Sequence, residues 1–216
     1  MSEDMHAELS ENAMPTLYQF QRSGNCYKIR LMAALLGVEH KTVSFDPPSG
    51  DHKKPEYLAI NPLAQVPAWV EDDDGPICDS QAILVYLSRR YDDSGRWFPS
   101  DARAAAEVTR WLSFTAYEIL YGLAFTRAMV ALGRPGDPEV NRPVGETALA
   151  TLNRELSDRD WLAASAPTIA DIAAYPYVSV ASDGGFSLDG YPSVVAWCQR
   201  IEALDRFEPF NPTGDV

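Results

Sequence analysis

The sequence is poor in positive charge. Lysine occurs only as Lys28, Lys41, Lys53 and Lys54, and 31 acidic side chains face 18 basic ones, for a net charge of −13. A nucleic-acid-binding surface needs a basic stripe to neutralise phosphates, and an anionic membrane surface repels an acidic protein. The composition therefore predicts no nucleic-acid partner and no membrane partner, and a small anionic ligand would have to be held by local donors.

Cysteines are few, and long apolar runs are missing. The three cysteines at 26, 78 and 198 are odd in number and show neither CxxC nor metal-ligand spacing, which favours a reducing compartment and no metal site. No stretch approaches the roughly 20 apolar residues of a membrane helix. Residues 1–14 lack the basic start and apolar core of a signal peptide, so we expect a disordered tail and a cytoplasmic protein.

Periodicity predicts an α/β domain at residues 15–93. Residues 16–20 indicate a strand, apolar positions between 29 and 36 recur at helical spacing, and residues 40–45 indicate a second strand. This order is the βαβ unit of two parallel strands. Further strands are predicted at 66–70 and 76–78, followed by a helix that begins at position 79 or 80, which gives the order βαβ-ββα.

From residue 101 onward the sequence is compatible with helices alone. Helices are predicted at 101–132, 139–157, 168–181 and 193–204. Thr168 and Asp171 have the spacing of a capping box, which is a folding signal and carries no chemistry. We therefore expect an all-α domain at residues 101–206.

The turn between the first strand and the first helix is a candidate site. A helix N-terminus presents free N–H groups and the positive end of the helix dipole, which suit an anion or a thiolate. Ser23 and Asn25 add side-chain donors, although either residue could simply cap the helix. Cys26 is a candidate nucleophile because helix N-termini lower thiol pKa values, but its place inside the helix favours a buried structural cysteine.

A proline in the third predicted strand is a second candidate. Pro67 cannot donate a hydrogen bond to a sheet, so it needs a special reason to be there. One reason is a cis peptide bond after Val66 that presents the backbone to a ligand, and the alternative is an edge strand or a bulge.

Two polar groups complete the candidates. Asp79 and Ser80 open a helix, where they could hold an ammonium and a carboxylate, cap the helix, or do both. The run of His52, Lys53 and Lys54 is the densest positive cluster of the chain, and it is either a contact for a ligand carboxylate or a solvated loop.

In this order the motifs resemble the cytosolic glutathione transferase superfamily over about residues 15–205. The stretches that carry the resemblance are LYQFQRSGNCYKIRLMAALLG, EYLAINPLAQVPAWVEDDDGPICDSQAILVYLSRRY and PTIADIAAYPYVSVA. It implies a thioredoxin-like domain followed by a helical-bundle domain, a homodimer, glutathione as co-substrate and no metal. It also implies a small hydrophobic electrophile as the second substrate, as in detoxification.

The resemblance also implies roles for individual residues. Ser23 would face the glutathione sulfur, beside Asn25, which aligns with an asparagine of some disulfide-reducing members. The backbone of Val66, ahead of a cis Pro67, would pair with the cysteinyl unit. Asp79 and Ser80 would hold the γ-glutamyl end of glutathione. Either His52 or Lys53, together with Gln65, would reach its glycyl end.

Two departures restrict the class of site. Members that use a tyrosine carry it where this chain has Gln19, while Tyr18 should point to the opposite face of the strand. Members that use a cysteine carry it at the position of Ser23, which Cys26 does not match. Chemistry through a protein tyrosine or thiol is therefore not expected.

The predicted mechanism is activation of the bound thiol by Ser23, assisted by Asn25 or a backbone N–H. The thiolate would attack an electrophilic carbon, a peroxide or a disulfide, and the alternative is a non-catalytic binding or interaction module. Four aromatic residues could line the second pocket or, equally, pack in a core or a dimer interface: Trp111, Phe114, Tyr117 and Tyr121.

Overall fold

A four-stranded mixed sheet organises the first half of the chain, of which the computed structural model describes residues 14–71 and 75–211. The strand order is β2-β1-β3-β4, with β1 at Thr16–Gln19, β2 at Lys41–Ser44, β3 at Ala68–Val70 and β4 at Ile77–Cys78. β1 pairs in parallel with β2 and antiparallel with β3, which pairs antiparallel with β4. The disordered tail predicted at 1–14 lies outside the described residues, except for its last residue.

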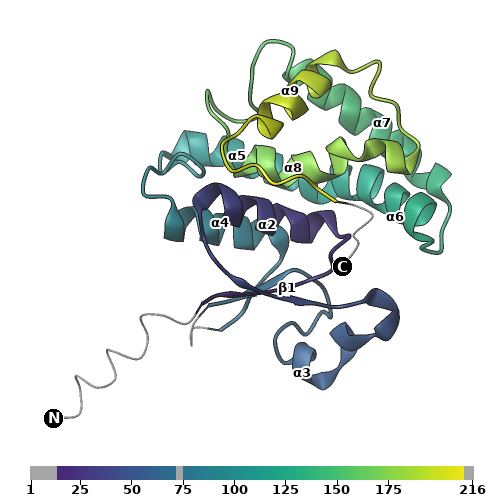
Figure 1. Cartoon of the computed structure of the whole chain (residues 1–216). Helices are drawn as coiled ribbons and strands as arrows, with labels where there is room; N and C mark the ends of the chain where they lie inside the picture. Colours follow the sequence, from purple (N-terminus) through teal and green to yellow (C-terminus); the bar gives the residue numbers. More distant parts are fainter. Residues whose placement is uncertain (1–13, 72–74, 212–216) are drawn as a thin grey trace.

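Helices cover both faces of this sheet. α2 (Gly24–Leu36) and α4 (Ser80–Tyr91) lie on the face turned toward the second half of the chain, and the short α3 (Pro55–Leu58) lies on the other face (Figure 1). The elements follow the predicted βαβ-ββα order. β3 begins after Pro67, not at position 66 as predicted, because a proline has no N–H for the ladder.

Helices alone make up the second half, which confirms the predicted fold class. The helix predicted at 101–132 is one continuous run, but its middle is π-helical. This middle segment lies close to the next helix, since a Cβ on Gly122 would come within 2.5 Å of the Cα of Gly145. The elements are α5 (Ala102–Phe114), η3 (Thr115–Ala124, the π-helical segment), α6 (Phe125–Leu132), α7 (Pro138–Glu155), α8 (Ile169–Ser179), η4 (Ala181–Gly184) and α9 (Pro192–Glu202).

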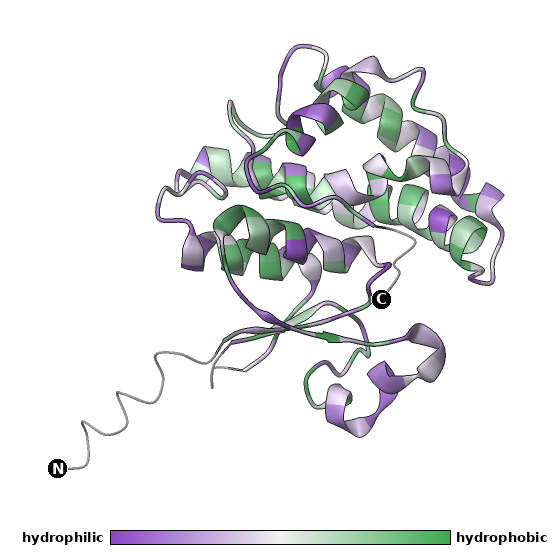
Figure 2. Ribbon diagram, viewed as in Figure 1, coloured by the Kyte–Doolittle hydropathy of each residue, from purple (hydrophilic) through white to green (hydrophobic). Residues whose placement is uncertain are grey.

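One apolar core runs through both halves of the molecule. α8 packs against both α2 and α4. Met32 and Leu84, from those two helices, belong to the same buried cluster as Ile172 and Trp197 of the helical half. Apolar residues accordingly gather where the facing helices meet (Figure 2). Since burial of this surface stabilises both halves together, the N-terminal turn of α2 is held at the junction between them.

The predicted capping box is present at the start of α8. Asp171 is fully buried and accepts hydrogen bonds from the backbone N–H of Thr168 at 2.9 Å, from that of Leu162 at 3.0 Å and from Nε1 of Trp197 at 2.9 Å. Each of these donors would otherwise be buried without a partner, which is costly. The carboxylate therefore joins the preceding loop, α8 and α9.

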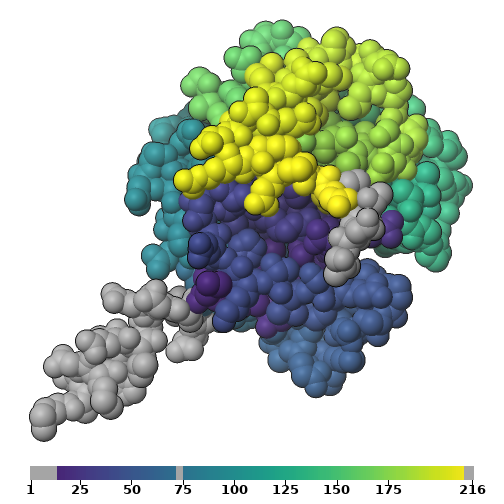
Figure 3. Space-filling view, viewed as in Figure 1, coloured from purple at the N-terminus to yellow at the C-terminus, as the bar shows by residue number. Residues whose placement is uncertain are grey.

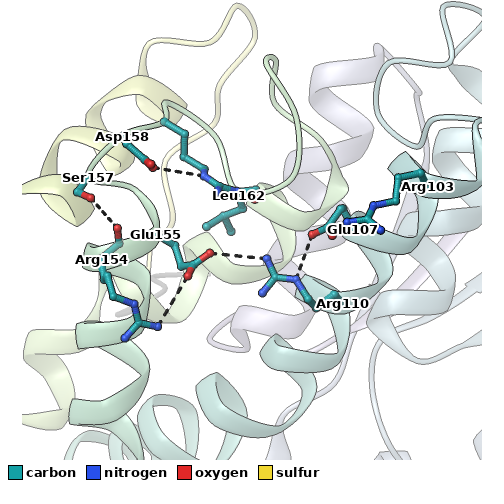
Figure 4. Close-up of polar contacts among 9 residues, drawn as sticks. Arg103, Glu107, Arg110, Arg154, Glu155, Ser157, Asp158 and Leu162 are labelled. Carbon is teal, nitrogen blue, oxygen red and sulfur yellow. Dashed lines mark hydrogen bonds and ion pairs between the residues drawn. The ribbon is translucent and has the colours of Figure 1, made fainter.

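Charged side chains connect α5 with the end of α7 on the surface (Figure 4). Nε of Arg110 donates to Glu107 at 3.1 Å, and its guanidinium lies 3.7 Å from a carboxylate oxygen of Glu155. Glu155 also pairs with Arg154 at 3.7 Å. Exposed pairs contribute about 0–1 kcal/mol each, so this network adds little to the core.

The segment after α9 returns to the first half of the chain. The hydroxyl of Tyr27 in α2 donates to the backbone oxygen of Glu208 at 2.5 Å, and its ring stacks on Phe210 with centroids 4.6 Å apart. Figure 3 shows this C-terminal segment in yellow, lying against the purple α2 region. The returning segment thus packs on α2 at Tyr27, whose ring also lies 6.4 Å from that of Tyr175 in α8.

Candidate functional site

The turn at the start of α2 brings the two predicted donors together. Ser23 is the N-cap, and its Oγ accepts the backbone N–H of Cys26 at 3.3 Å, which leaves the hydroxyl proton free of that bond. Oδ1 of Asn25 accepts a hydrogen bond from Nζ of Lys28 at 2.8 Å, which leaves the amide N–H₂ group as the free end of that side chain. Capping and a ligand-binding role are therefore compatible for Ser23.

Tyr177, a residue that sequence reasoning missed, reaches this turn from α8. Its ring packs so closely on Gly24 that a Cβ there would lie 2.6 Å from Cε1. Its oxygen accepts the backbone N–H of Asn25 at 3.1 Å. Burial raises the pKa of Tyr177 to about 12, although this N–H and a hydrogen bond to Ser23 lower it, so the hydroxyl keeps its proton at neutral pH. One backbone donor of the helix N-terminus is thus already engaged by a side chain.

Arg127 of α6 holds the same turn from another direction. Its guanidinium is buried, pairs with Asp183 at 2.9 Å and donates to the backbone oxygen of Arg22 at 3.2 Å. The turn is therefore fixed by two side chains of the helical half, at Arg22 and at Asn25. Neither contact has a signal in the sequence, since each joins residues more than a hundred positions apart.

Cys26 points away from solvent. Its sulfur accepts the backbone N–H of Phe20 at 3.4 Å, and the side chain is completely buried. Burial raises the thiol pKa and outweighs the hydrogen bonds and the positive charges of Lys28 and Arg30 that lower it. A buried thiol with a raised pKa is a poor nucleophile, which agrees with a structural cysteine.

The Val66–Pro67 peptide bond is cis, as predicted. The loop ahead of it is held by its backbone: the oxygen of Gln65 accepts from the Tyr57 hydroxyl at 2.6 Å and from Nδ2 of Asn61 at 2.8 Å. The side chain of Gln65 is exposed. These two hydrogen bonds hold the backbone just ahead of the cis bond, which in turn precedes β3.

Asp79 and Ser80 lie at the start of α4. Asp79 has a φ of +77°, and its Oδ1 caps the helix by accepting the N–H groups of Gln81 at 2.8 Å and Ala82 at 3.2 Å. A non-glycine residue in this backbone region is strained and often marks a functional position. The cap uses one carboxylate oxygen, and Ser80 is 4% exposed.

Of the predicted positive cluster, the imidazole of His52 lies nearest to the turn. Its ring meets that of Phe20 edge-on at 5.1 Å, and Phe20 lies just before the turn. Lys53 is exposed, and Lys54 pairs with Asp51 at 2.5 Å. Among the contacts described, His52 is therefore the member of this cluster that touches a residue next to the turn.

The four aromatic residues predicted for a second pocket do not share one surface. Trp111 is fully buried, so we correct its assignment: it belongs to the core, where Phe114 packs against it at 5.2 Å. Tyr117 and Tyr121 are 58% and 43% exposed and contact each other at 5.1 Å. The prediction assumed regular α-helical spacing, whereas the π-helical segment rotates residues 115–124 relative to α5.

Lys28 was also missed as part of the site. It is 2% exposed, and its ammonium lies 5.6 Å from the ring centroid of Tyr177. Burial lowers its pKa to about 7, while the charge of Asp79 acts in the opposite direction. The signal in the sequence was its place three residues after Asn25, which is one helical turn.

The cavities elsewhere on the molecule do not contain the predicted site residues. A surface cavity of about 510 Å³ lies between the end of α7 and α9, and a second of about 380 Å³ lies beside Arg30 and His40; neither is lined by a predicted site residue. Among the residues described, no group of three His, Cys, Asp or Glu could hold a metal ion. The same part of the chain contains no helix long and apolar enough to span a membrane.

Comparisons with known proteins match both halves of the chain. The family model of the glutathione S-transferase N-terminal domain matches residues 22–90, and that of the C-terminal domain matches residues 135–205. Glutathione S-transferase D7 of Anopheles gambiae is 32% identical over 207 residues, which cover 93% of each chain.

Solved structures give the same result. The crystal structure of a possible glutathione S-transferase from Rhodopseudomonas palustris has a TM-score of 0.85 at 31% identity, covering 92% of this chain and 98% of that one. A glutathione transferase homologue from Drosophila mojavensis, solved with bound glutathione, has a TM-score of 0.80 at 25% identity, covering 89% of each chain.

Proposed function

Because the chain belongs to the cytosolic glutathione transferase superfamily, we propose that it is an enzyme that binds glutathione at the turn before α2 and activates its thiol. The observation that supports this best is the pair of side-chain donors at the turn, of which the Ser23 hydroxyl also bonds that of Tyr177. The hydroxyl proton of Ser23 and the amide N–H₂ of Asn25 are both unused by the cap and by the Lys28 contact. Two donors beside one sulfur would stabilise its anion.

The energy required is within reach of these donors. A free thiol with a pKa near 8.5 is only a few per cent ionised at about pH 7. A hydrogen bond to a charged group is worth roughly 1.5–3 kcal/mol, and a pKa unit is about 1.4 kcal/mol. One donor would therefore lower the thiol pKa by about 1–2 units, so that much of the bound glutathione is thiolate near neutral pH.

The remaining contacts would hold the ends of glutathione. The backbone of Val66, next to the cis peptide bond, would pair with the cysteinyl unit, and Asp79 and Ser80 would bind the γ-glutamyl end. His52 is the leading candidate for the glycyl carboxylate because its ring contact with Phe20 keeps it beside the turn. Lys53 and Gln65, whose side chains are exposed, could close on the ligand from the loop.

The second substrate would approach from the helical half. Tyr117 and Tyr121 offer exposed rings to a small hydrophobic electrophile, a peroxide or a disulfide. We also propose a homodimer and a cytoplasmic location, as the family resemblance implies. Sedimentation of the purified protein tests the dimer.

One observation favours a non-catalytic binding module instead. The backbone N–H of Asn25 is already bonded to Tyr177, so the turn satisfies part of its own hydrogen-bonding capacity without a ligand. Thermal unfolding with and without millimolar glutathione distinguishes ligand binding from none, because a ligand that binds only the folded state raises the melting temperature.

Turnover separates an enzyme from a module that binds glutathione without reaction. A chromogenic electrophile, a peroxide and a small disulfide should be assayed in parallel with glutathione. Binding together with turnover of at least one of them supports the enzyme, and binding without turnover supports the module. Absence of any stabilisation by glutathione would contradict the proposed site itself.

A further inference from the structure

Lys28 is an unusual residue for the inside of a protein. Lysine is almost never fully buried unless it is paired, yet Lys28 is 2% exposed. Within the described residues, none of the salt bridges involves it. Its hydrogen-bond partner is the side-chain oxygen of Asn25 at 2.8 Å, and its ammonium lies 5.6 Å from the ring centroid of Tyr177.

A purely structural role explains this arrangement poorly. An ammonium whose partners are a neutral amide and an aromatic ring recovers only part of the hydration that it loses on burial. An apolar side chain of similar length would fill the same space without that cost. The position of the charge, one helical turn below the two donors of the site, suggests a role in the chemistry.

The contact also decides which way the Asn25 amide faces. An ammonium has three hydrogen-bond donors and no acceptor, so only the oxygen of the amide can face Lys28. The N–H₂ group is then directed to the opposite side. Without the ammonium, the amide is free to turn its oxygen outward, where it would repel an anionic sulfur.

We propose that Lys28 is a positioning residue of the thiol site, which holds the Asn25 amide with its N–H₂ group toward the glutathione sulfur and adds positive charge beneath the start of α2. This inference rests on the proposed function. Lys28 does not touch the ligand; it acts through Asn25 and through its charge. Tyr177 covers the ammonium from α8, which keeps water from weakening its field.

The charge of Lys28 depends on pH near neutrality. The groups that face it are the protonated thiol of Cys26 in α2, the carboxylate of Asp79 at the start of α4 and the hydroxyl of Tyr177 in α8. Burial lowers the pKa of Lys28 to about 7. The assistance is therefore largest below neutral pH, and a bound thiolate in turn favours the charged ammonium, because such coupling is reciprocal.

The test is the Lys28→Met variant, which removes the charge and keeps the length of the side chain. The ultraviolet absorbance of the thiolate, followed against pH in the presence of saturating glutathione, gives the pKa of the bound thiol. We expect the variant to raise that pKa by about one unit, so that turnover falls about ten-fold at about pH 6 and differs little at about pH 9. A loss that is equal at both pH values would indicate a structural role and contradict the inference.

Two further variants complete the experiment. Lys41→Met removes an exposed lysine of β2 and should leave the thiol pKa unchanged. Because Lys28 acts partly through Asn25, the Lys28→Met change should raise the pKa of the bound thiol by less in an Asn25→Ala background. Fully additive effects of the two changes on that pKa would contradict a role of Lys28 through Asn25.

A measurement on the free wild-type protein does not depend on whether the variant folds. The side-chain NMR titration of Lys28 in the free wild-type protein should have its midpoint near 7. A midpoint near that of a free lysine contradicts the inference alone. Wild-type protein that shows no thiolate absorbance with glutathione contradicts the proposed function, whereas wild-type absorbance that Lys28→Met leaves unchanged contradicts only the role of Lys28.

Discussion

At the scale of single residues, Ser23 caps α2 with its oxygen, and its hydroxyl proton takes no part in the cap. We expect Ser23→Ala to remove one charged hydrogen bond, worth roughly 1.5–3 kcal/mol, and so to raise the pKa of bound glutathione by about 1–2 units. Turnover at neutral pH should then fall about ten- to hundred-fold. Thiolate absorbance and steady-state rates measure both effects. If Ser23→Ala and Asn25→Ala each leave the thiol pKa in place, the proposed mechanism is wrong.

Tyr177 is a second residue-scale case. Tyr177→Phe keeps the ring on Gly24 but leaves the buried N–H of Asn25 without its acceptor, so we expect a stability loss of about 1–2 kcal/mol and a several-fold loss of glutathione turnover. Tyr175→Phe is the matched control, because Tyr175 lies in the same helix as Tyr177 and its hydroxyl donates to Glu202 of α9 at 2.9 Å, away from the turn. Chemical denaturation and rates should show a stability loss in both variants, and equal loss of turnover in the two would argue against a role of Tyr177 at the turn.

Sequence reasoning reached the residues whose roles depend on their neighbours in the chain. The N-cap at Ser23, the cis bond before Pro67 and the cap at Asp79 are local, because each is governed by backbone geometry within a few positions. Tyr177 and Arg127 could not be found in this way. Their contacts join distant segments, and a buried tyrosine in a helical stripe resembles any other core aromatic.

At the scale of elements, the buried carboxylate of Asp171 holds three pieces of structure. Asp171→Ala would leave donors of Thr168, Leu162 and Trp197 without partners, and we expect a loss of about 3–5 kcal/mol. Asp101→Ala, at the exposed N-cap of α5, is the control and should cost about 1 kcal/mol. Urea denaturation compares the two. Equal losses would mean that the Asp171 network adds nothing to an ordinary cap.

Helix positions were predictable from apolar periodicity, but the helical geometry within them was not. The run from α5 to α6 was predicted as one helix, and Gly122 approaches Gly145 of α7 within its π-helical middle. Six residues of a regular α-helix span about 600°, so Trp111 and Tyr117 point to different sides of the axis, the first into the core and the second toward solvent. Packing between helices, and not the local sequence, decides such a detail.

At the scale of the whole molecule, Lys28 links stability to pH. Its folded pKa of about 7 lies below the ordinary 10.5, so between these values the unfolded chain binds the extra proton and stability rises with pH. Below about pH 7 the full cost of burying the charge applies, up to about 5 kcal/mol by the shift. Lys28→Met should therefore be most stabilising below neutrality, with an advantage that shrinks toward pH 10.

Urea denaturation of the wild type and the variant across about pH 6–10 measures this difference. The difference between the two proteins matters more than either curve. Burial raises the pKa of Tyr27 and of Cys198, so ionisation of these groups in the unfolded chain lowers the stability of both proteins toward the alkaline end. Lys41→Met should run parallel to the wild type. A Lys28→Met advantage that stays constant with pH would show that Lys28 does not change its charge in this range.

The hydrogen bonds of Arg127 and Tyr177 with the turn before α2 restrict which substitutions the two halves of the chain can accept independently. Exchange of the helical half between relatives would change this turn, because the new half brings its own side chains into contact with the backbone on either side of Ser23. A chimera that kept the α/β half but received other residues at 127 and 177 would lose the two hydrogen bonds that hold the turn around Ser23. The two halves should therefore coevolve, with substitutions at the turn compensated by substitutions at 127 or 177.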